Sequence, residues 1–256
     1  MADLPVMVIS GGSRGIGAAI AQLAARSGYN VGVNYTSATD RAEEVVKGIR
    51  AGGGDAVAVR ADISKPEDVV RLFDDASRAL GPLRVLINNA GVDFPSPVAD
   101  AEIEGMRRMI EINLFGAIVC TREAIRRMST KRGGSGGVIV NISSIAAVHG
   151  GMPGDCVYAA TKGGLDSLTL GVAKEVSGEG IRVCGVRPGI IRTEMWQGQL
   201  ENEEIEEMGK KAVPLGRVGE VNDIAGVAVW LCSAQASYMT GAIVNVSGGR
   251  EIFVRN

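Results

Sequence analysis

A tyrosine and a lysine four residues apart form the pair whose types and spacing are best suited to chemistry. Tyr158 and Lys162 lie in an apolar stretch, 155–176, that we expect to be helical. Residues i and i+4 share one face of a helix, so the phenol and the ammonium would point into the same space. A free tyrosine has a pKa of about 10, and a nearby cation favours its ionised form. The pair is therefore a candidate general acid and base, the alternative being a surface tyrosine beside a solvated lysine.

Two further polar positions interrupt apolar segments. Asn113 stands inside an otherwise apolar part of a helix that we predict over about 101–131. A buried amide without partners costs about 1–3 kcal/mol, so Asn113 either ties the core together or joins a polar network. Ser143 and Ser144 follow a predicted strand over 138–142.

A glycine-rich turn follows the first predicted strand, 6–9. It carries Gly11, Gly15 and Gly17 and leads into an alanine-rich segment, 18–27, that we expect to be helical. Backbone N–H groups of such a turn can reach a pyrophosphate at the helix N-terminus. The spacing G-x3-G-x-G differs from the general dinucleotide fingerprint, so a plain tight turn is the alternative.

The end of the second predicted strand, 31–35, carries information about the cofactor. Folds that select NAD place an acidic residue there to bond the ribose 2′-hydroxyl, whereas this chain has Asn34, Tyr35 and Thr36. Arg14 in the glycine turn could pair with a 2′-phosphate. NADP is therefore favoured over NAD. Arg41 is either a second phosphate contact or a solvated helix residue.

Short apolar segments alternate with helix-sized segments along the whole chain. This alternation predicts right-handed βαβ units in one doubly wound parallel sheet of seven strands, with helices on both faces. The length of 256 residues suits a single domain over 1–256. Polar residues at strand ends, Asp62 and the stretch 88–91, would lie where open α/β sheets bind ligands, the alternative for either being a turn or a helix cap. The expected strands are 6–9, 31–35, 56–59, 85–87, 138–142, 181–186 and 242–246. We expect one helix after the second strand, at 38–50, and another between the third and fourth strands, at 66–79.

The composition excludes several classes of protein. The net charge is −2 and the basic residues are scattered, so neither nucleic acid nor an anionic membrane is an expected partner. We find neither a targeting segment nor eighteen consecutive apolar residues, and we expect a cytoplasmic protein. With four cysteines that show no paired spacing and a single histidine, we expect no metal site and no disulfide.

Taken together, the motifs resemble the short-chain dehydrogenase/reductase family, most closely bacterial members of the glucose-1-dehydrogenase-like and 3-oxoacyl-carrier-protein-reductase-like kinds. The matching elements occur in the family's order and spacing over nearly the whole chain. They are the glycine turn, Asp62, Asn88-Asn89-Ala90-Gly91, Asn113, Ser144, Tyr158 with Lys162, and Pro188-Gly189 followed by Thr193. The resemblance implies a single-domain Rossmann fold.

The resemblance also implies a set of catalytic roles. Tyr158 would protonate a carbonyl oxygen, or deprotonate an alcohol in the reverse reaction. Lys162 would lower the pKa of Tyr158 and hold the nicotinamide ribose. Ser144, rather than Ser143, would hydrogen-bond the substrate oxygen, and Asn113 would hold a water that passes protons to Lys162.

Cofactor contacts follow from the same resemblance and from the motifs above. Besides Tyr158 and Lys162, the expected contacts are Gly11, Ser13, Arg14, Gly15, Ile16 and Gly17 at the pyrophosphate, Asn34, Tyr35 and Thr36 at the adenosine ribose, Asp62 and Ile63 at the adenine, Asn89, Ala90 and Gly91 along the adenosine, and Pro188, Gly189, Ile191 and Thr193 at the carboxamide.

Substrate choice is expected to depend on two less regular segments. The interval from Ser144 to Tyr158 is one residue longer than in many relatives, which we place in the loop 149–156; His149 there is interpreted as a pocket or surface residue and not as a base. Residues 194–212, with Trp196, would form a lid. Family members assemble as tetramers, so a homotetramer is expected.

The leading hypothesis is an NADP-dependent oxidoreductase that interconverts a small carbonyl compound and an alcohol. One alternative is an NAD-dependent sugar or alcohol dehydrogenase, and another is a non-catalytic nucleotide-binding sensor or scaffold. A carrier-protein substrate is not favoured, because Glu179 stands where such reductases tend to have a basic residue; Lys131 and Arg132 remain as candidate docking charges.

Overall fold

The computed structural model describes residues 4–193 and 202–252, and its centre is one seven-stranded sheet in which every neighbouring pair is parallel. The strand order is β3-β2-β1-β4-β5-β6-β7, which is a doubly wound topology, as predicted. The strands are β1 Val6–Ile9, β2 Asn30–Tyr35, β3 Ala56–Arg60, β4 Leu83–Asn88, β5 Gly137–Ile142, β6 Ile181–Pro188 and β7 Ile243–Val246. Their near-continuous apolar sequences fit strands covered on both faces.

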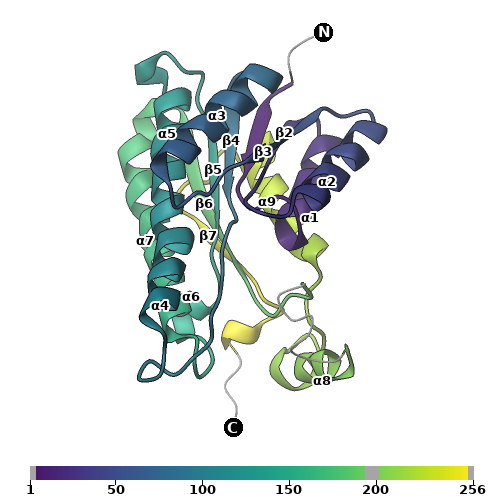
Figure 1. Ribbon diagram of the computed structural model, residues 1–256, viewed down its shortest axis with the longest axis vertical. Helices are drawn as coiled ribbons and strands as arrows, with labels where there is room; N and C mark the ends of the chain where they lie inside the picture. Colours follow the sequence, from purple (N-terminus) through teal and green to yellow (C-terminus); the bar gives the residue numbers. More distant parts are fainter. Residues whose placement is uncertain (1–3, 194–201, 253–256) are drawn as a thin grey trace.

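Helices cover both faces of the sheet (Figure 1). On one face α1 (Gly15–Arg26), α2 (Thr39–Ala51) and α9 (Val221–Cys232) pack over one apolar cluster. On the other, α3 (Pro66–Leu80), α5 (Ala117–Met128) and α7 (Cys156–Val176) pack over a second cluster. The predicted fold class is confirmed.

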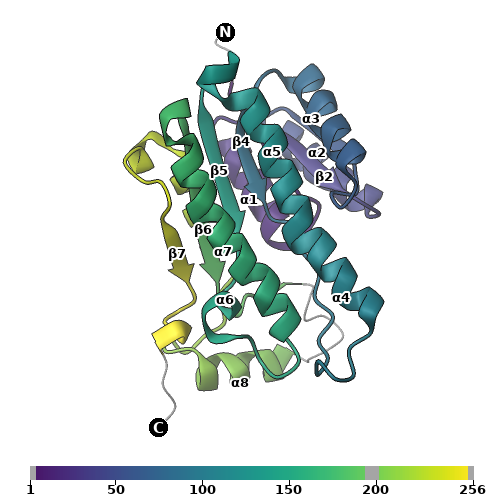
Figure 2. The same ribbon diagram turned by 90° about the vertical axis from the view of Figure 1, so that its left-hand side faces the viewer.

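The order of the strands reverses between β1 and β4. The glycine turn follows β1 and the stretch Asn88–Gly91 follows β4, so both lie at this switch point, where doubly wound sheets bind ligands. The short elements α4 (Ile103–Ile110), α6 (Ala146–His149) and α8 (Asn202–Ala212) lie beyond the carboxyl ends of the strands (Figure 2). The remaining turns are 3-10 segments at Thr130–Arg132, Ser177–Glu179, Ala234–Ala236 and Arg250–Ile252.

The helix predicted over 101–131 is helical from Ile103 to Met128, but it is not α-helical throughout. It consists of α4, a π-helical turn at Glu111–Gly116, and α5, which ends at Met128. A Cβ on Gly116 would lie 2.8 Å from the side chain of Ile63, so glycine allows the turn to approach the end of β3. Such π turns occur frequently at functional sites, and this one contains Asn113. The helix α6, which lies just before the predicted loop 149–156, was also not foreseen.

A chain of buried amides and hydroxyls connects the sheet to α7. Asn88 donates to Asn141 Oδ1 at 2.9 Å and to Thr121 Oγ1 at 3.0 Å, and Asn141 donates to Thr169 Oγ1 at 2.8 Å. Asn141 and Thr169 are fully buried. Because buried polar groups stabilise only when paired, this chain fixes the register of α7 against β4 and β5.

The described residues also bear on the excluded classes. No helix among them is long and apolar enough to cross a membrane, and they contain no group of His, Cys, Asp and Glu suited to hold a metal ion. The four cysteines are free thiols. Cys120, Cys184 and Cys232 are buried, whereas Cys156 is exposed at the start of α7.

Candidate active site

Tyr158 and Lys162 share one face of the first turns of α7. The Lys162 Nζ atom lies 5.5 Å from the centroid of the Tyr158 ring and donates to the main-chain oxygen of Ile142 at 3.0 Å. Lys162 is only 4% exposed. A Cβ on Gly91 would lie 3.5 Å from Nζ, so the loop after β4 forms the opposite wall. The pair therefore lies at the carboxyl ends of β4 and β5.

Burial controls the titration of both groups. It raises the pKa of Tyr158 to about 12, against a lowering by the hydrogen bond from Ser144, and Asp93 and Asp155 raise it further. Burial lowers the pKa of Lys162 to about 8, although Asp166 and Asp93 oppose this. The expected lowering of the tyrosine pKa by Lys162 is thus not found in the protein alone, because desolvation is larger and Nζ is directed to the Ile142 carbonyl.

The two serines after β5 face different groups. Ser144 hydrogen-bonds the Tyr158 phenol and accepts a bond from the Ala146 N–H at 3.1 Å. Ser143 is buried, and its hydroxyl donates to the main-chain oxygen of Lys162 at 3.2 Å. Ser144 therefore faces the reactive phenol, and Ser143 holds the backbone of α7.

Asn113 directs its side chain to the loop after β4. Its Nδ2 donates to the Val92 oxygen at 2.8 Å and to Thr161 Oγ1 at 3.3 Å, while its Oδ1 accepts from the Val92 N–H at 2.8 Å. Asn113 is 1% exposed. The amide fixes the wall that faces Lys162, so its side chain acts on the loop's backbone.

The glycine turn is folded closely onto itself. Gly11 has a φ of 63°, which glycine adopts without strain. A Cβ on Gly17 would lie 2.2 Å from the Gly11 oxygen and 2.6 Å from Asn89 Nδ2. Asn89 Nδ2 donates to the main-chain oxygens of Ser10 and Gly11 at 3.0 and 2.9 Å. Asn89 thus shapes the turn, and Ala90 packs against Gly11.

Ser13, Arg14, Gly15 and Ile16 complete the turn and open α1. Arg14 is exposed, whereas Ser13 is buried. Because the first N–H groups of a helix have no intrahelical acceptor, this end of α1 can bind a phosphate, as the motif predicts. A Cβ on Gly15 would lie 3.7 Å from the Thr193 side chain, so the loop after β6 comes close to the turn.

The two residues predicted to contact the adenine make contacts with other residues of the protein. Asp62 accepts from Ser64 Oγ at 2.7 Å and from Arg108 Nη2 at 2.8 Å. Burial raises the pKa of Asp62, but these bonds outweigh it and hold the pKa below its ordinary value. Ile63 is buried against Gly116. Arg108, from α4, was not foreseen; no sequence signal placed it beside Asp62.

The three predicted residues at the end of β2 differ in their exposure and in their contacts. Asn34 is 2% exposed; it accepts from the Gly11 N–H at 3.1 Å and donates to the Ala61 oxygen at 2.9 Å, so its side chain braces the turn. Tyr35 is half-buried and Thr36 is exposed. A hollow next to this strand end is lined by Ser13, Arg14, Gly15, Ala18, Gln22, Arg41, Glu44 and Val45.

The loop after β6 lies across the site from the glycine turn. The main-chain oxygen of Pro188 accepts from the Ile145 N–H at 3.0 Å, and the Gly189 N–H donates to the Val246 oxygen at 3.0 Å. A Cβ on Gly189 would lie 2.7 Å from the Cα atom of Ser247. Ile191 is buried and pairs with Gly219. These contacts fix the turn that leads to Thr193.

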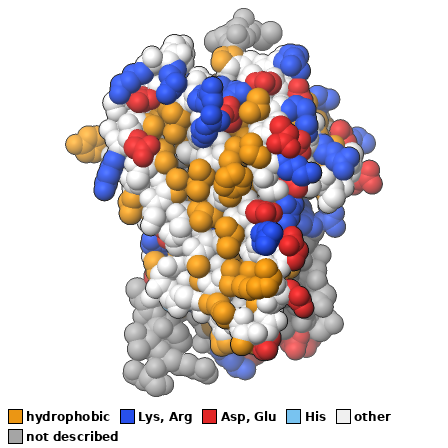
Figure 3. Space-filling model, turned by 60° about the vertical axis from the view of Figure 1, so that its left-hand side comes forward, with side chains coloured by type: hydrophobic (Ala, Val, Ile, Leu, Met, Phe, Trp, Pro, Cys, Tyr) orange, Lys and Arg blue, Asp and Glu red, His pale blue; other side chains and the backbone are white. Residues whose placement is uncertain are grey.

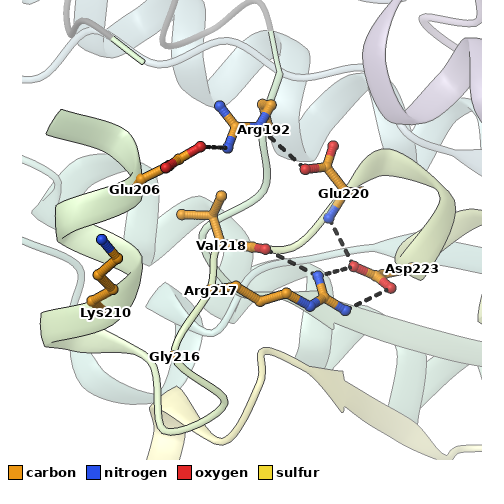
Figure 4. Close-up of a pocket in the computed structure, with 8 residues that line it drawn as sticks. All are labelled: Arg192, Glu206, Lys210, Gly216, Arg217, Val218, Glu220 and Asp223. Atoms are coloured by element: carbon orange, nitrogen blue, oxygen red, sulfur yellow. Dashed lines mark hydrogen bonds and ion pairs between the residues drawn. The ribbon is translucent and has the colours of Figure 1, made fainter. Parts of the chain in front are cut away.

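Part of the expected lid, residues 194–201 with Trp196, lies outside the described residues. The described part, α8, packs through an apolar cluster that includes Ile205 and Ile190. A charged hollow beside it is shown in Figure 4, where Arg192 pairs with Glu206 at 3.8 Å and with Glu220 at 3.2 Å. These contacts connect α8 to the loop after β6.

Two carboxylates near the reactive pair were not foreseen from the sequence. Asp93 follows Gly91 by two residues, and burial together with Asp155 raises its pKa to about 6. Its buried Oδ1 has no hydrogen-bond partner among the described residues. The loops that carry the two carboxylates touch, because the Ser96 N–H donates to the Gly154 oxygen at 3.1 Å. His149 is exposed, and its Nδ1 accepts from the Gly151 N–H.

Comparison with known proteins identifies the relatives of this site and fold. The profile of the family described as Enoyl-(Acyl carrier protein) reductase matches residues 11–251. The uncharacterized oxidoreductase YgfF of Escherichia coli K12 is 43% identical over 96% of this chain and 100% of its own length. A short-chain dehydrogenase/reductase from Serratia marcescens BCRC 10948 has 33% identity and a TM-score of 0.89, covering 96% of this chain and 98% of its own. The chain belongs to the short-chain dehydrogenase/reductase family.

Membership of this family makes the protein an oxidoreductase acting on CH–OH or carbonyl groups. The resemblance stated from the sequence motifs is confirmed. A further relative, the 3beta-hydroxysteroid dehydrogenase 1 of Eggerthella lenta, is 38% identical over 96% of this chain and 94% of its own length. Its name specifies a substrate for that protein.

Proposed function

We propose that the protein is an NADP-dependent oxidoreductase that interconverts a small carbonyl compound and its alcohol, with Tyr158 as general acid and base. The observation that carries the proposal is the convergence of Ser144, Tyr158 and Lys162 at the carboxyl ends of the strands, opposite the glycine turn. The non-catalytic alternative gives no reason for a phenol, a hydroxyl and a buried ammonium to meet there.

The reduction needs one hydride and one proton. A bound nicotinamide cofactor supplies the hydride to the carbonyl carbon. Tyr158 gives its proton to the carbonyl oxygen as the C=O π bond opens, and Ser144 donates a hydrogen bond to that oxygen. With a pKa of about 12, the phenol holds its proton at neutral pH, which suits an acid in the direction of reduction.

Lys162 would return a proton to Tyr158 after each reduction. We also assign Asn113 to the relay, but in a role that differs from the one predicted from the sequence. Its side-chain amide is committed to Val92 and Thr161, so a water in the relay would be held by a main-chain oxygen of the π turn.

NADP is the proposed cofactor because the end of β2 has no carboxylate between Asn34 and Ala38, and because Arg14 and Arg41 line one hollow beside it. Glu44 lines the same hollow, so two cations face one carboxylate there. A 2′-phosphate in this hollow would contact the two guanidinium groups.

Titration with NADPH and NADH by fluorescence quenching tests this choice. We expect NADPH to bind at least tenfold more tightly, about 1.4 kcal/mol, and Arg14→Ala to remove most of that preference. Arg26→Ala, at the exposed far end of α1, is the control and should leave it unchanged. Equal or tighter NADH binding by the unaltered protein would favour the NAD-dependent sugar or alcohol dehydrogenase instead.

The substrate side favours a small apolar carbonyl compound over a carrier protein. Phe94 and Met152 are 47% and 45% exposed on the two touching loops next to Asp93 and Asp155. Lys131, a candidate docking charge, pairs with Glu179 at 3.3 Å. A hydroxysteroid, as named for the Eggerthella lenta relative, is a first compound to screen.

We further propose that the protein is a homotetramer. Exposed apolar side chains on α4, the π turn, α5 and α7 form a band down one face (Figure 3); they include Ile110, Phe115, Ile118 and Leu170. Such a surface is typical of an interface. Light scattering of the unaltered protein should give four times the 26.6 kDa of the chain, and Phe115→Glu with Leu170→Glu should give a smaller species.

A further inference from the structure

One turn after Lys162, α7 carries a carboxylate that belongs to an ion pair with β6. Asp166 Oδ2 accepts from Arg187 Nε at 2.8 Å, and the two side chains are 10% and 19% exposed. The other oxygen, Oδ1, is buried and has no hydrogen-bond partner among the described residues. Arg187 also donates to Asn245 Oδ1 at 3.4 Å. The pair therefore lies mostly out of water and is only partly compensated.

The ion pair links α7, which carries Tyr158 and Lys162, to the end of β6, where the cofactor is expected to bind. Asp166 is at i+4 from Lys162, so the two side chains share a face of α7. Arg187 directly precedes Pro188 and Gly189, the turn expected to grip the carboxamide. Burial disfavours the charged form of Lys162, and Asp166 is the group that opposes this effect most strongly. The ion pair thus lies next to the proton-handling lysine without touching the reacting atoms.

We infer that Asp166 and Arg187 are positioning residues that set the charge of Lys162. Asp166 stabilises the protonated form of the lysine, and Arg187 limits this stabilisation. Since a buried charge acts over longer distances than an exposed one, the carboxylate favours the charged lysine. Arg187 neutralises part of this negative charge and, as a cation, also opposes the charged lysine. The inference rests on the proposed function, because it assigns these residues to the relay that serves Tyr158.

Other charged groups around Lys162 are few, and each comes from a different element. The loop after β4 contributes Asp93, which also favours the charged lysine. On α7, Tyr158 faces Nζ, and Asp155, just before the helix, acts on Tyr158 and Asp93. The end of β5 contributes a neutral carbonyl, and the π turn contributes the neutral Asn113. Among the described residues, Arg187 on β6 is the cation that pairs with Asp166, whereas Arg250, near the end of the described chain, interacts with Asp155.

Direct titration of Lys162 tests the inference without cofactor or substrate. Carbon-13 NMR of the lysine Cε atoms, with the signal assigned by its loss in Lys162→Arg, reports the pKa of Lys162 in the unloaded protein. We expect Asp166→Asn to lower this pKa by about one unit and Arg187→Gln to raise it. Arg187→Lys, which keeps the charge, should leave it close to the original value. Asp75→Asn, which breaks an exposed pair with Arg78 on α3, is the control for loss of an ion pair elsewhere.

The opposite signs distinguish a role in charge control from a purely structural brace. A brace would lose stability in both variants while the pKa of Lys162 stayed the same or moved in one direction, and that result would overturn the inference. If Asp166→Asn does not fold, Arg187→Gln alone decides, since only charge control raises the pKa. Absence of NADPH binding in the unaltered protein would instead contradict the proposed function, and leave the measured pKa shifts as evidence on the ion pair.

Discussion

Asn113 and Val92 exchange two hydrogen bonds, each of 2.8 Å, between one side-chain amide and one residue's backbone. This pairing joins the π turn to the loop that follows β4. It places Gly91 against both Asn113 and Lys162, at distances of 3.4 and 3.5 Å from the position of a Cβ on the glycine. The wall that faces Lys162 therefore depends on the side-chain amide of Asn113.

Replacement of Asn113 by alanine should reduce stability and activity together. Both main-chain groups of Val92 would lose their partners, and each buried unpaired group costs about 1–3 kcal/mol. Urea unfolding should show a loss within or above that range, and turnover should fall because the loop no longer faces Lys162. Thr161→Val is the control: it removes the 3.3 Å contact with Asn113 and the 2.7 Å bond from Thr161 to the Tyr158 main-chain oxygen, but leaves both bonds to Val92, and it should have a smaller effect. Equal effects in the two variants would contradict this role of Asn113.

Substitution in the glycine turn should affect cofactor binding before it affects the fold. In Gly17→Ala the new methyl group would lie 2.2 Å from the Gly11 oxygen, so the turn must open. We expect at least a tenfold loss of NADPH affinity, measured by fluorescence quenching. Gly48→Ala, in α2 with no atom within 4 Å of its Cβ, is the control. It should bind NADPH normally and gain up to about 1 kcal/mol of stability.

The two unforeseen carboxylates should tune the pH dependence of catalysis. Ionised Asp93 raises the pKa of Tyr158, because it opposes a second negative charge nearby. Asp93→Asn should therefore lower the pKa of Tyr158, and oxidation of the alcohol, which needs the ionised phenol, should become fast at a lower pH. Asp155→Asn should move the profile in the same direction, since Asp155 also raises the pKa of Tyr158.

The pH–rate profile of alcohol oxidation measures this shift. Asp100→Asn, on the exposed surface, is the control and should leave the profile in place. A profile of Asp93→Asn that moves to higher pH, or does not move, would show that Asp93 does not act on the phenol.

Much of the fold was predictable because local patterns and the global topology agree. Buried strands such as 6–9 are continuous apolar runs in the sequence, and the glycine turn marks the start of α1. The π turn was not predictable, because it arises from the approach of Gly116 to Ile63, which is a tertiary contact. The same limit applies to helix α6 within the loop before α7.

The site, like the fold, was predictable only in part. The motif positions identify which residues surround the reactive pair, but not which atoms they use. Asn34, Asn89 and Asn113 direct their amides to the backbone, although spacing alone suggests direct contacts with a ligand. Asp93 could have been noticed as a carboxylate near the stretch 88–91, whereas its contact with the 152–155 loop depends on the fold.

The most direct test of the proposed function is the turnover of Tyr158→Phe. Oxidation of NADPH is followed at 340 nm with a panel of ketones and aldehydes that includes a 3-oxosteroid, and NADPH binding is measured on the same samples. We expect the unaltered protein to reduce at least one compound, and Tyr158→Phe to lose at least a hundredfold of that rate while it binds NADPH as before. Turnover that survives the substitution would contradict Tyr158 as the general acid, and absence of turnover in the unaltered protein would favour the nucleotide-binding sensor.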